Sequence, residues 1–325
     1  MKPEVLVTRA VQEGPLALLR QEAEVTVHRG ERPMAEQEIL VALPRKKGLF
    51  SMAENSISAR ILEAGRDLKI VANYGVGYDN IDLQAATRLK IAVTNTPDVL
   101  TDTTADLAFT LILGIARRIA ECDRFVREGN WVHARSIHLM GADVHGSTLG
   151  IVGLGRIGSA VARRAIGFNT KTLYTDIRPI DQAVENQLRV RRVSLEELLG
   201  GSDFVTLHVP LTAQTTHLIG REQLNLMRKS AFLINASRGR VVDEEALVEA
   251  LKNKTIAGAA LDVFEREPHV SPELLAMANV LMTPHMGSAT FKTREEMAFS
   301  AVRNIMAAIR GEVPPNILNP EIYKS

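Results

Sequence analysis

Short apolar runs alternate with longer amphipathic stretches along most of the chain. In the first third of the chain, β-branched runs typical of strands lie at residues 5–7, 25–28, 48–50, 69–73 and 91–94. A second series begins at Thr148 and continues at residues 171–176, 204–207, 231–235, 256–261 and 280–283. Strands that alternate with helices form parallel sheets. The pattern therefore predicts an α/β protein with two doubly wound parallel sheets.

The alternation is interrupted between the two series. Pro97 and Asp98 end the first series, and residues 102–106 begin a helix that we expect to reach about Gly129 and to bridge two domains. A length of 325 residues also favours two domains. We predict a first domain at residues 1–98, completed by residues 288–325 with their last helix at 293–310. The second domain is predicted at residues 99–287.

Composition excludes several classes of function. The net charge is +1 and no long basic or acidic block is present, which argues against partners such as nucleic acid or an anionic membrane. The most apolar segment, residues 107–116, is about half the length needed to cross a bilayer. The single cysteine, Cys122, lies in an amphipathic stretch and is predicted to be a buried thiol. A protein of the reducing cytoplasm is expected.

The stretch 148–158 indicates a strand, a tight turn and a helix, with glycines spaced G-x-G-x-x-G. Gly153 permits the turn, Gly155 lets the backbone approach a ligand, and Gly158 lets the helix lie close to the strand. The free N–H groups at the start of the helix suit a pyrophosphate. Asp176 ends the next strand, where a carboxylate that binds a ribose is expected. A plain strand–helix turn and a solvated Asp176 are the alternatives.

Three later segments each end a predicted strand: residues 235–239 with Arg238, residues 261–268 with Asp262 and Glu267, and residues 283–288 with His285. The carboxyl ends of parallel strands face the ligand crevice of an open sheet. We therefore expect these side chains to converge. Together they supply a cation, a carboxylate and an imidazole.

The chain resembles the D-isomer-specific 2-hydroxyacid dehydrogenase family. The motifs V-G-L-G-R-I-G, N-A-S-R-G, D-V-F-E-R-E-P and T-P-H-M-G-S occur in the expected order, and residues 73–82 match in the first domain. The resemblance implies a flavodoxin-like domain and a dinucleotide-binding domain, both Rossmann-like, with a cleft between them. It also implies NAD as cofactor, no metal ligands, and a homodimer built through the helix at 101–129 and the segment after it.

The resemblance implies a role for each converging side chain in the reduction of a 2-oxo acid. Arg238 would hold the substrate oxygens with its forked guanidinium. His285 would donate the proton, and Glu267 would accept from its other ring nitrogen and fix the tautomer. A surface arginine and a turn histidine are the alternatives. His269 and His133 are expected to be exposed to solvent.

Further contacts are implied by the resemblance. The N–H groups of Val76 and Gly77 would bind the substrate carboxylate, unless the glycines there only form a turn. Residues 49–52 are expected as a mostly apolar loop in which Ser51 and Met52 line the substrate site, with ordinary strand core as the alternative. Asp262 would hold the nicotinamide amide or only cap its strand. The remaining cofactor-binding residues implied are Thr104, Arg156, Ile157, His208, Val209, Pro210, Thr215, Ala236, Ser237 and Gly287.

Positions at which this chain departs from its relatives reduce the range of possible cofactors and substrates. Asp176 would repel the 2′-phosphate of NADP, and NADP-using relatives carry glycine and arginine where this chain has Asp176 and Ile177. Arg178 is the counterargument, because it could turn toward a phosphate. Val76 replaces the lysine of phosphite-oxidising relatives, and Met52 aligns with an arginine of phosphoglycerate dehydrogenases. A phosphorylated substrate is therefore disfavoured, unless Lys46 or Lys47 turns inward.

We predict an NAD(H)-dependent D-2-hydroxyacid dehydrogenase whose small-molecule substrate is a 2-oxo acid such as glyoxylate or hydroxypyruvate. A phosphoglycerate dehydrogenase or a sugar-acid dehydrogenase of the 2-ketogluconate type is the alternative among enzymes. An NADH-sensing protein similar to the corepressors that resemble this family is the alternative of another class. Consumption of NADH with a panel of 2-oxo acids separates these hypotheses.

Overall fold

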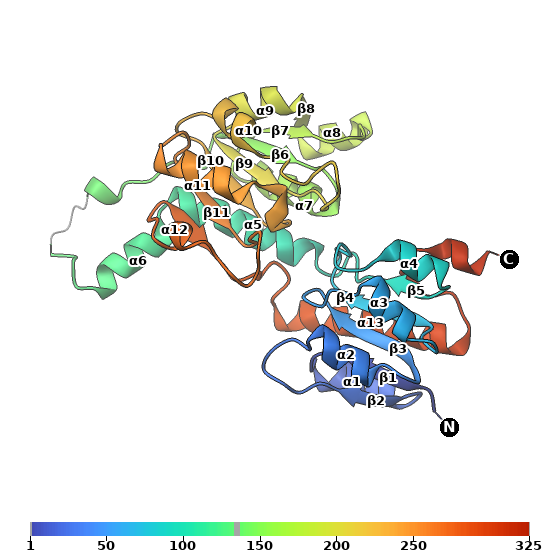
Figure 1. The fold of residues 1–325 in the computed structure, drawn as a ribbon. Helices are drawn as coiled ribbons and strands as arrows, with labels where there is room; N and C mark the ends of the chain where they lie inside the picture. Colours follow the sequence, from blue (N-terminus) through green and yellow to red (C-terminus); the bar gives the residue numbers. More distant parts are fainter. Residues whose placement is uncertain (1, 133–136, 325) are drawn as a thin grey trace. The chain divides into compact units, whose positions relative to one another are not determined.

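The computed structural model describes residues 2–132 and 137–324 and divides into two compact units (Figure 1). The first unit is Met1–Leu100 with Ser288–Ser325, and the second is Thr101–Gly287. The boundary between the N-terminal segment of the first unit and the second unit, after Leu100, therefore lies two residues after the expected position 98. Each unit contains one sheet in which all strand pairs are parallel. The predicted class, two doubly wound parallel-sheet domains, is confirmed.

The first unit has the strand order β2-β1-β3-β4-β5 in its described residues, the order of flavodoxin-like folds. Its strands are β1 (Glu4–Val7), β2 (Glu24–Val27), β3 (Lys46–Met52), β4 (Ile70–Tyr74) and β5 (Ala92–Thr94). Its helices are α1 (Glu13–Arg20), α2 (Glu36–Ala42), α3 (Ala59–Ala64), α4 (Leu83–Arg88), α13 (Phe291–Arg310) and the 3-10 turn η3 (Pro320–Tyr323). Helix α13 packs on β3, β4 and α1, while α2, α3 and α4 bury the apolar cluster on β1, β3 and β4.

The expectation of a loop at residues 49–52 is wrong. These residues end β3 and pair with β4 from Leu49↔Val71 to Met52↔Tyr74. Ser51 is fully buried and Met52 is 4% exposed. A central strand of a parallel sheet is covered on both faces, so its sequence is apolar without alternation. The alternative of ordinary strand core is the correct one here.

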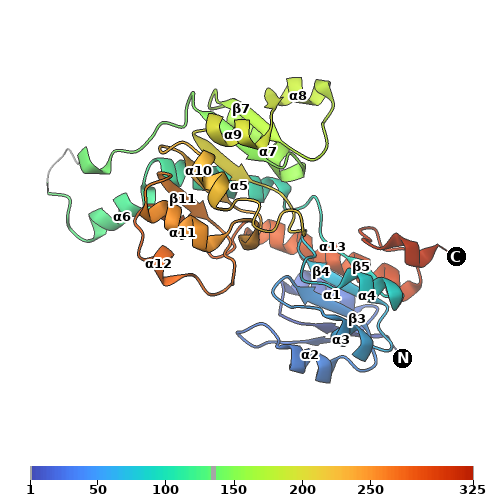
Figure 2. The same ribbon diagram turned by 45° about the horizontal axis from the view of Figure 1, so that its top comes forward.

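The second unit has the strand order β12-β11-β10-β9-β6-β7-β8 in its described residues. Figure 2 shows this unit from a second direction. The order reverses between β6 and β9, as in dinucleotide-binding folds. The strands are β6 (Thr148–Val152), β7 (Lys171–Thr175), β8 (Val190–Arg192), β9 (Phe204–Leu207), β10 (Phe232–Asn235), β11 (Gly258–Leu261) and β12 (Val280–Met282). The sequence pattern did not predict β8, a short edge strand with two exposed arginines.

Helices cover both faces of this second sheet. Helices α5 and α7 bury one apolar cluster, whereas α9, α10 and α11 bury another. The helices are α5 (Thr101–Ala116), α6 (Ile119–Arg127), α7 (Arg156–Ile166), α8 (Gln182–Leu188), α9 (Leu195–Gly201), α10 (Arg221–Leu226), α11 (Glu244–Lys252) and α12 (Pro272–Leu275), with 3-10 turns η1 (Ile137–Leu139) and η2 (Gly239–Val241). Among the described residues, no helix is both long and apolar enough to cross a membrane.

The single long helix expected at 102–129 is wrong, because two helices occupy this range. Arg118 has a left-handed backbone with φ of 52° and separates α5 from α6. Its guanidinium bonds Glu121 and the carbonyl of Met140, which holds the break in place. Neither glycine nor proline marks the break in the sequence. Cys122 in α6 is partly exposed, so the expected burial of its thiol is also wrong.

The C-terminal segment is joined to the first sheet by buried amides. Asn319 is fully buried. Its Oδ1 accepts from the Val93 N–H at 2.9 Å, and its Nδ2 donates to the Ile91 carbonyl at 2.9 Å. These bonds satisfy the Val93 N–H and the Ile91 carbonyl, two buried backbone groups that water does not reach.

We expect Asn319→Ala to destabilise the first unit by about 2–4 kcal/mol, because the substitution leaves a buried donor and a buried acceptor unpaired. The measurement is the urea midpoint of the full-length protein, followed by circular dichroism. Glu321→Ala, an exposed position two residues further on, serves as the control and should leave the midpoint unchanged. Equal midpoints for both variants would show that Asn319 does not anchor the C-terminal segment.

Candidate active site

The surroundings of the three glycines after β6 differ, so each position favours glycine for a different physical reason. Gly153 has φ of 92°, and a Cβ there would lie 2.7 Å from the His208 carbonyl oxygen. A Cβ on Gly158 would lie 2.1 Å from the Gly153 carbonyl oxygen, so α7 packs directly on the turn. Gly155 precedes α7, and a Cβ there would meet nothing within 4 Å. The turn therefore needs two of its glycines for packing and leaves open space at the third.

The carboxylate of Asp176 is bound to this turn. Its Oδ2 accepts from the Leu154 N–H at 2.8 Å, and its Oδ1 accepts from the Arg178 N–H at 3.1 Å. The side chain is therefore fixed beside the glycine turn, at the carboxyl end of β7. The Arg178 bond is the local bond of a turn residue, whereas the Leu154 bond joins the carboxylate to the glycine turn.

The loop that carries Arg238 is shaped by a side chain to which the sequence pattern assigned no role. Asn235 is 1% exposed; its Nδ2 donates to the Arg238 carbonyl at 2.9 Å, and its Oδ1 accepts from the Ser237 N–H and hydroxyl. A Cβ on Gly239 would lie 1.9 Å from the Phe264 carbonyl oxygen. The Arg238 loop thus lies against the segment that leads to Glu267.

Glu267 and His285 form a hydrogen-bonded pair. The His285 Nδ1 lies 2.8 Å from the Glu267 Oε2, and the Glu267 Oε1 accepts from the Phe264 N–H at 3.0 Å. Burial raises the pKa of Glu267, but the hydrogen bond and charge of His285 outweigh it, aided by the Phe264 N–H and the Arg238 charge, so the pKa is lowered. The carboxylate is therefore charged at neutral pH. It binds Nδ1 and leaves Nε2 of the imidazole available.

Two other histidines were expected to be exposed to solvent. His269, two residues after Glu267, is exposed. His133 lies outside the described residues.

Asp262 fixes the backbone of the segment that contains His285. His285 has φ of 54°, a left-handed conformation that costs about 1–3 kcal/mol and persists only when surrounding contacts impose it. Its N–H donates to the Asp262 carbonyl at 2.8 Å. The Asp262 carboxylate, which is buried, accepts from the Thr283 hydroxyl at 2.5 Å, the Met286 N–H at 2.7 Å and the Gly287 N–H at 2.9 Å. Burial raises the pKa of Asp262, and these three donors oppose that rise.

Other predicted cofactor residues lie in the same unit. Burial lowers the pKa of His208 to about 4, so its imidazole is neutral. The His208 Nε2 lies 2.9 Å from the Thr206 hydroxyl, and among the described residues its Nδ1 has no partner. Thr215 donates to the Pro210 carbonyl at 2.6 Å and closes the loop after β9. Thr104 is a buried residue of α5. Cofactor contacts of these residues stay predictions.

In the first unit, hydrogen bonds fix the loop after β4. The carbonyl oxygens of residues 75–77 accept, in order, from the Thr96 N–H at 2.9 Å, the Asn95 side chain at 2.8 Å and the Asn73 side chain at 2.7 Å. Among the residues that the structure describes, the N–H groups of Val76 and Gly77 donate to no backbone carbonyl outside the strands. These three bonds hold the backbone of the loop in one conformation.

The lysines considered as partners for a phosphate lie at the wrong end of β3. Lys46 pairs with Glu4 at 2.6 Å and Lys47 with Asp67 at 3.0 Å. Both begin the strand that Met52 ends, about 17–20 Å away for an extended chain. The Ser51 hydroxyl is buried and lies 3.4 Å from the Asn73 Oδ1. Neither lysine nor Ser51 therefore presents a polar group at the carboxyl end of β3.

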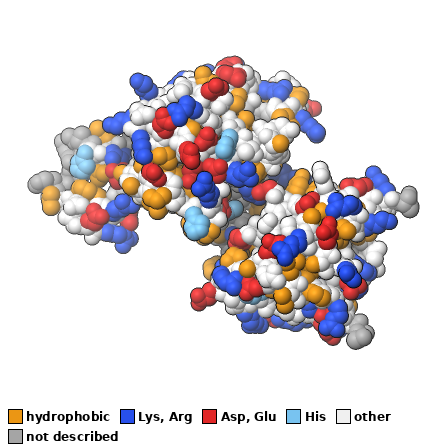
Figure 3. Space-filling model, viewed as in Figure 1, with side chains coloured by type: hydrophobic (Ala, Val, Ile, Leu, Met, Phe, Trp, Pro, Cys, Tyr) orange, Lys and Arg blue, Asp and Glu red, His pale blue; other side chains and the backbone are white. Residues whose placement is uncertain are grey.

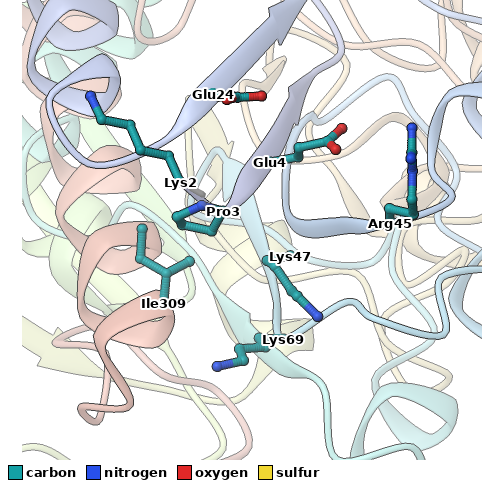
Figure 4. A pocket seen from close by; sticks show the side chains of 8 residues that line it. All are labelled: Lys2, Pro3, Glu4, Glu24, Arg45, Lys47, Lys69 and Ile309. Atoms are coloured by element: carbon teal, nitrogen blue, oxygen red, sulfur yellow. The ribbon is translucent and has the colours of Figure 1, made fainter.

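A hollow of about 420 Å³ opens at this amino end of the first sheet (Figure 4). It is lined by Lys2, Pro3, Glu4, Glu24, Arg45, Lys47, Lys69 and Ile309. Ligands of open α/β sheets bind at the carboxyl ends of the strands, so its position argues against a substrate site. Among the described residues, no three His, Cys, Asp or Glu side chains are grouped as metal ligands.

Known proteins similar to this chain identify its family. The model of the D-isomer specific 2-hydroxyacid dehydrogenase NAD-binding domain matches residues 109–287, more than half of the chain. The chain belongs to this family. A protein named glyoxylate reductase from Korarchaeum cryptofilum is 50% identical over 328 residues, which cover 100% of this chain and 98% of the relative. The predicted family is therefore confirmed.

Two solved structures extend the comparison. A protein from Thermus thermophilus with a known crystal structure is 43% identical to this chain, with a TM-score of 0.91. The match covers 97% of this chain and 99% of the Thermus protein. An NADPH-dependent glyoxylate/hydroxypyruvate reductase from Sinorhizobium meliloti, in complex with NADP and malonate, is 34% identical with a TM-score of 0.89. The match covers 98% of this chain and 97% of that reductase. The family's fold thus spans both units.

The second unit of this family member fits a dinucleotide. Open space at Gly155 lets phosphate oxygens approach the backbone at the start of α7, where the helix dipole favours negative charge. The fixed Asp176 carboxylate stands at the end of the neighbouring strand. His208 and Gly153 lie in contact at the point where the strand order reverses. These features agree with the dinucleotide-binding arrangement.

Gly155 and Gly158 should respond differently to alanine. Gly158→Ala places a methyl group 2.1 Å from a carbonyl oxygen and should lower the melting temperature by several degrees or prevent folding. Gly155→Ala meets no protein atom and should keep the melting temperature, but should weaken NADH binding by about tenfold or more, because the methyl group occupies the phosphate approach. Calorimetry and NADH fluorescence titration measure the two effects. Unchanged NADH affinity in Gly155→Ala would place the cofactor elsewhere.

Proposed function

We propose that this protein uses NADH to reduce a small 2-oxo acid, glyoxylate or hydroxypyruvate, to the D-2-hydroxy acid. The observation that carries the proposal is the Glu267–His285 pair beside the Arg238 loop. The pair and the loop lie at the carboxyl ends of three adjacent strands, which supports a proton donor and a cation there. The relative from Korarchaeum cryptofilum is named glyoxylate reductase, and the one from Sinorhizobium meliloti is named glyoxylate/hydroxypyruvate reductase.

The side chains divide the work of the reaction. NADH, when bound, supplies the hydride. Arg238 holds the carboxylate and carbonyl oxygens of the substrate and favours the negative charge that develops on the carbonyl oxygen. The His285 Nε2 gives its proton to that oxygen, and Glu267 keeps Nδ1 protonated and the ring oriented. The His285 side chain is 43% exposed, so it regains a proton from solvent.

The first unit supplies uncharged donors in the proposed complex. The N–H groups of Val76 and Gly77 bind the substrate carboxylate, supported by the carbonyl bonds of residues 75–77. Asp262 holds the nicotinamide amide as well as its own loop. The other residues proposed to contact the cofactor are Thr104, Gly153, Gly155, Arg156, Ile157, Gly158, Asp176, His208, Val209, Pro210, Thr215, Ala236, Ser237 and Gly287.

Phosphoglycerate and sugar-acid dehydrogenases remain the alternatives among enzymes. The pairing of Lys46 and Lys47 at the amino end of β3 argues against a phosphorylated substrate. A corepressor-like sensor would need NADH binding but no proton donor, and the Glu267–His285 pair favours the enzyme. Cys122 is a free thiol, which agrees with the reducing cytoplasm as the proposed place of action.

A homodimer is the proposed assembly. No residue of α6 is buried, and its apolar side chains Ile119 and Val126 are 58% and 53% exposed, as is Trp131 at 62%. Figure 3 shows hydrophobic side chains among charged ones in this region. A monomer rarely leaves an amphipathic helix uncovered, so a second copy of the chain is the proposed cover.

The proposed substrates should be separated by kcat/KM with NADH at one pH and salt concentration. Glyoxylate and hydroxypyruvate should exceed pyruvate with a bulky apolar 3-substituent. They should exceed 3-phosphohydroxypyruvate by about a hundredfold or more, because a phosphate would lose water without gaining a cation. If the phosphorylated acid is the best substrate, the proposed function is wrong.

Two substitutions test the proton donor. His285→Gln should lower kcat by about 10²- to 10⁴-fold and leave NADH binding nearly unchanged. Glu267→Gln keeps a hydrogen bond but loses the charge that the lowered pKa of Glu267 maintains in the wild type. The imidazolium is then stabilised less, so reduction should fall away at lower pH than in the wild type.

The control for the pH profile is Glu265→Gln. Glu265 pairs with another histidine, His217, at 2.8 Å and lies two residues from Glu267. Its substitution removes the same charge from the same segment and should leave the pH at which activity falls unchanged. Identical shifts in both variants would mean that general charge, and not the Glu267–His285 contact, sets the profile.

The homodimer is tested with Val126→Glu combined with Trp131→Glu. Two buried charges at the interface should convert a dimer to a monomer in light scattering, because unpaired charges are costly to desolvate. Val41→Glu in α2, which is 73% exposed, is the matched control and should leave the mass unchanged. A wild-type protein that is already monomeric would contradict the proposed assembly.

A further inference from the structure

Arg192 lies beside Asp176 through a contact that no sequence pattern indicated. It is the last residue of the edge strand β8, pairs with Tyr174 of β7 and is exposed. Its Nη2 donates to the backbone carbonyl of Asp176 at 2.8 Å. A guanidinium carries five N–H donors, and this bond uses one of them. The carbonyl contact therefore keeps a cation with further donors at the position of Asp176.

The carboxylate at this position is equally fixed. Its two oxygens accept from the N–H groups of Leu154 and Arg178, and a carboxylate has about four lone-pair sites. Acceptor capacity for two ribose hydroxyls thus remains. An anion and a cation therefore stand together at the end of β7. NAD and NADP differ only in the 2′-phosphate, which these two charges affect in opposite directions.

We propose that Arg192 is a specificity-determining residue that binds the 2′-phosphate of NADP(H) and so limits the rejection of that cofactor by Asp176. The inference rests on the proposed function, because the adenosine ribose must lie at Asp176. An uncharged 2′-hydroxyl gains little from the guanidinium, whereas a phosphate dianion gains a charge-assisted bond. The protein prefers NADH to NADPH, but by a smaller margin than Asp176 alone would set.

Two charged side chains near Arg192 have partners elsewhere. Glu185 accepts from the Tyr174 hydroxyl at 2.5 Å and from Gln182 at 3.1 Å. The neighbouring arginine of the same strand, Arg191, pairs instead with Glu197 at 2.7 Å. Successive residues of a strand point to opposite faces, which separates the two guanidinium groups. Arg191 is therefore a matched control of the same type, strand and exposure.

The test is calorimetric titration of the full-length protein with adenosine 2′,5′-bisphosphate and with AMP, which differ only in the 2′-phosphate. Arg192→Ala should weaken binding of the bisphosphate by about five- to tenfold at low salt, while AMP binding changes by less than about twofold. Arg191→Ala should change neither. Asp176→Asn removes the repulsion and keeps bisphosphate binding measurable. Adding Arg192→Ala to Asp176→Asn should remove most of the gain.

Two outcomes overturn the proposal. Unchanged affinities for both ligands in Arg192→Ala remove Arg192 from cofactor selection. An equal loss for both ligands shows that Arg192 only supports the Asp176 peptide. A wild-type protein that oxidises NADH with glyoxylate keeps the proposed function in either case. A wild-type protein that binds neither AMP nor NADH contradicts the proposed function and this inference together.

Discussion

All strands of the Thr101–Gly287 sheet run parallel, and the candidate site depends on this constraint. Parallel strands place their carboxyl ends at one edge, and the order β12-β11-β10 sets three of these ends side by side. Asn235, Asp262 and Thr283 end or directly follow those strands. The cation, carboxylate and imidazole that are distant in the sequence therefore become neighbours. Helices on both faces keep the edge fixed, because they bury the apolar side chains of the strands.

Buried polar side chains fix the conformation of the loops at this edge of the sheet. Asp262 binds three donors of the segment that carries His285, and Asn235 binds the segment that carries Arg238. Burial raises the pKa of Asp262, and these donors oppose that rise only in part. Burial also raises the pKa of Glu267, but the hydrogen bond and charge of His285, the Phe264 N–H and the Arg238 charge together outweigh it, so that pKa is lowered. The electrostatics of the site thus follow from the backbone that the sheet positions.

The two units offer different chemistry at the carboxyl ends of their strands. The second unit presents charged side chains around Glu267 and a backbone turn without side chains at Gly155. In the first unit, buried asparagines such as Asn73 bind backbone carbonyls of the loop after β4.

Local sequence determined the family, the two parallel sheets, and the residues that follow each central strand, because apolar periodicity and glycine spacing are local signals. Tertiary structure alone decided the contacts between distant segments. Arg118 has a left-handed backbone and ends α5 although neither it nor its two neighbours in the sequence is glycine or proline. Residues 49–52 are core because they belong to a strand that pairs with both β1 and β4 in the middle of the sheet. Arg192 reaches Asp176 only through strand pairing. Such contacts join residues far apart in the chain, and packing, not local preference, fixes their geometry.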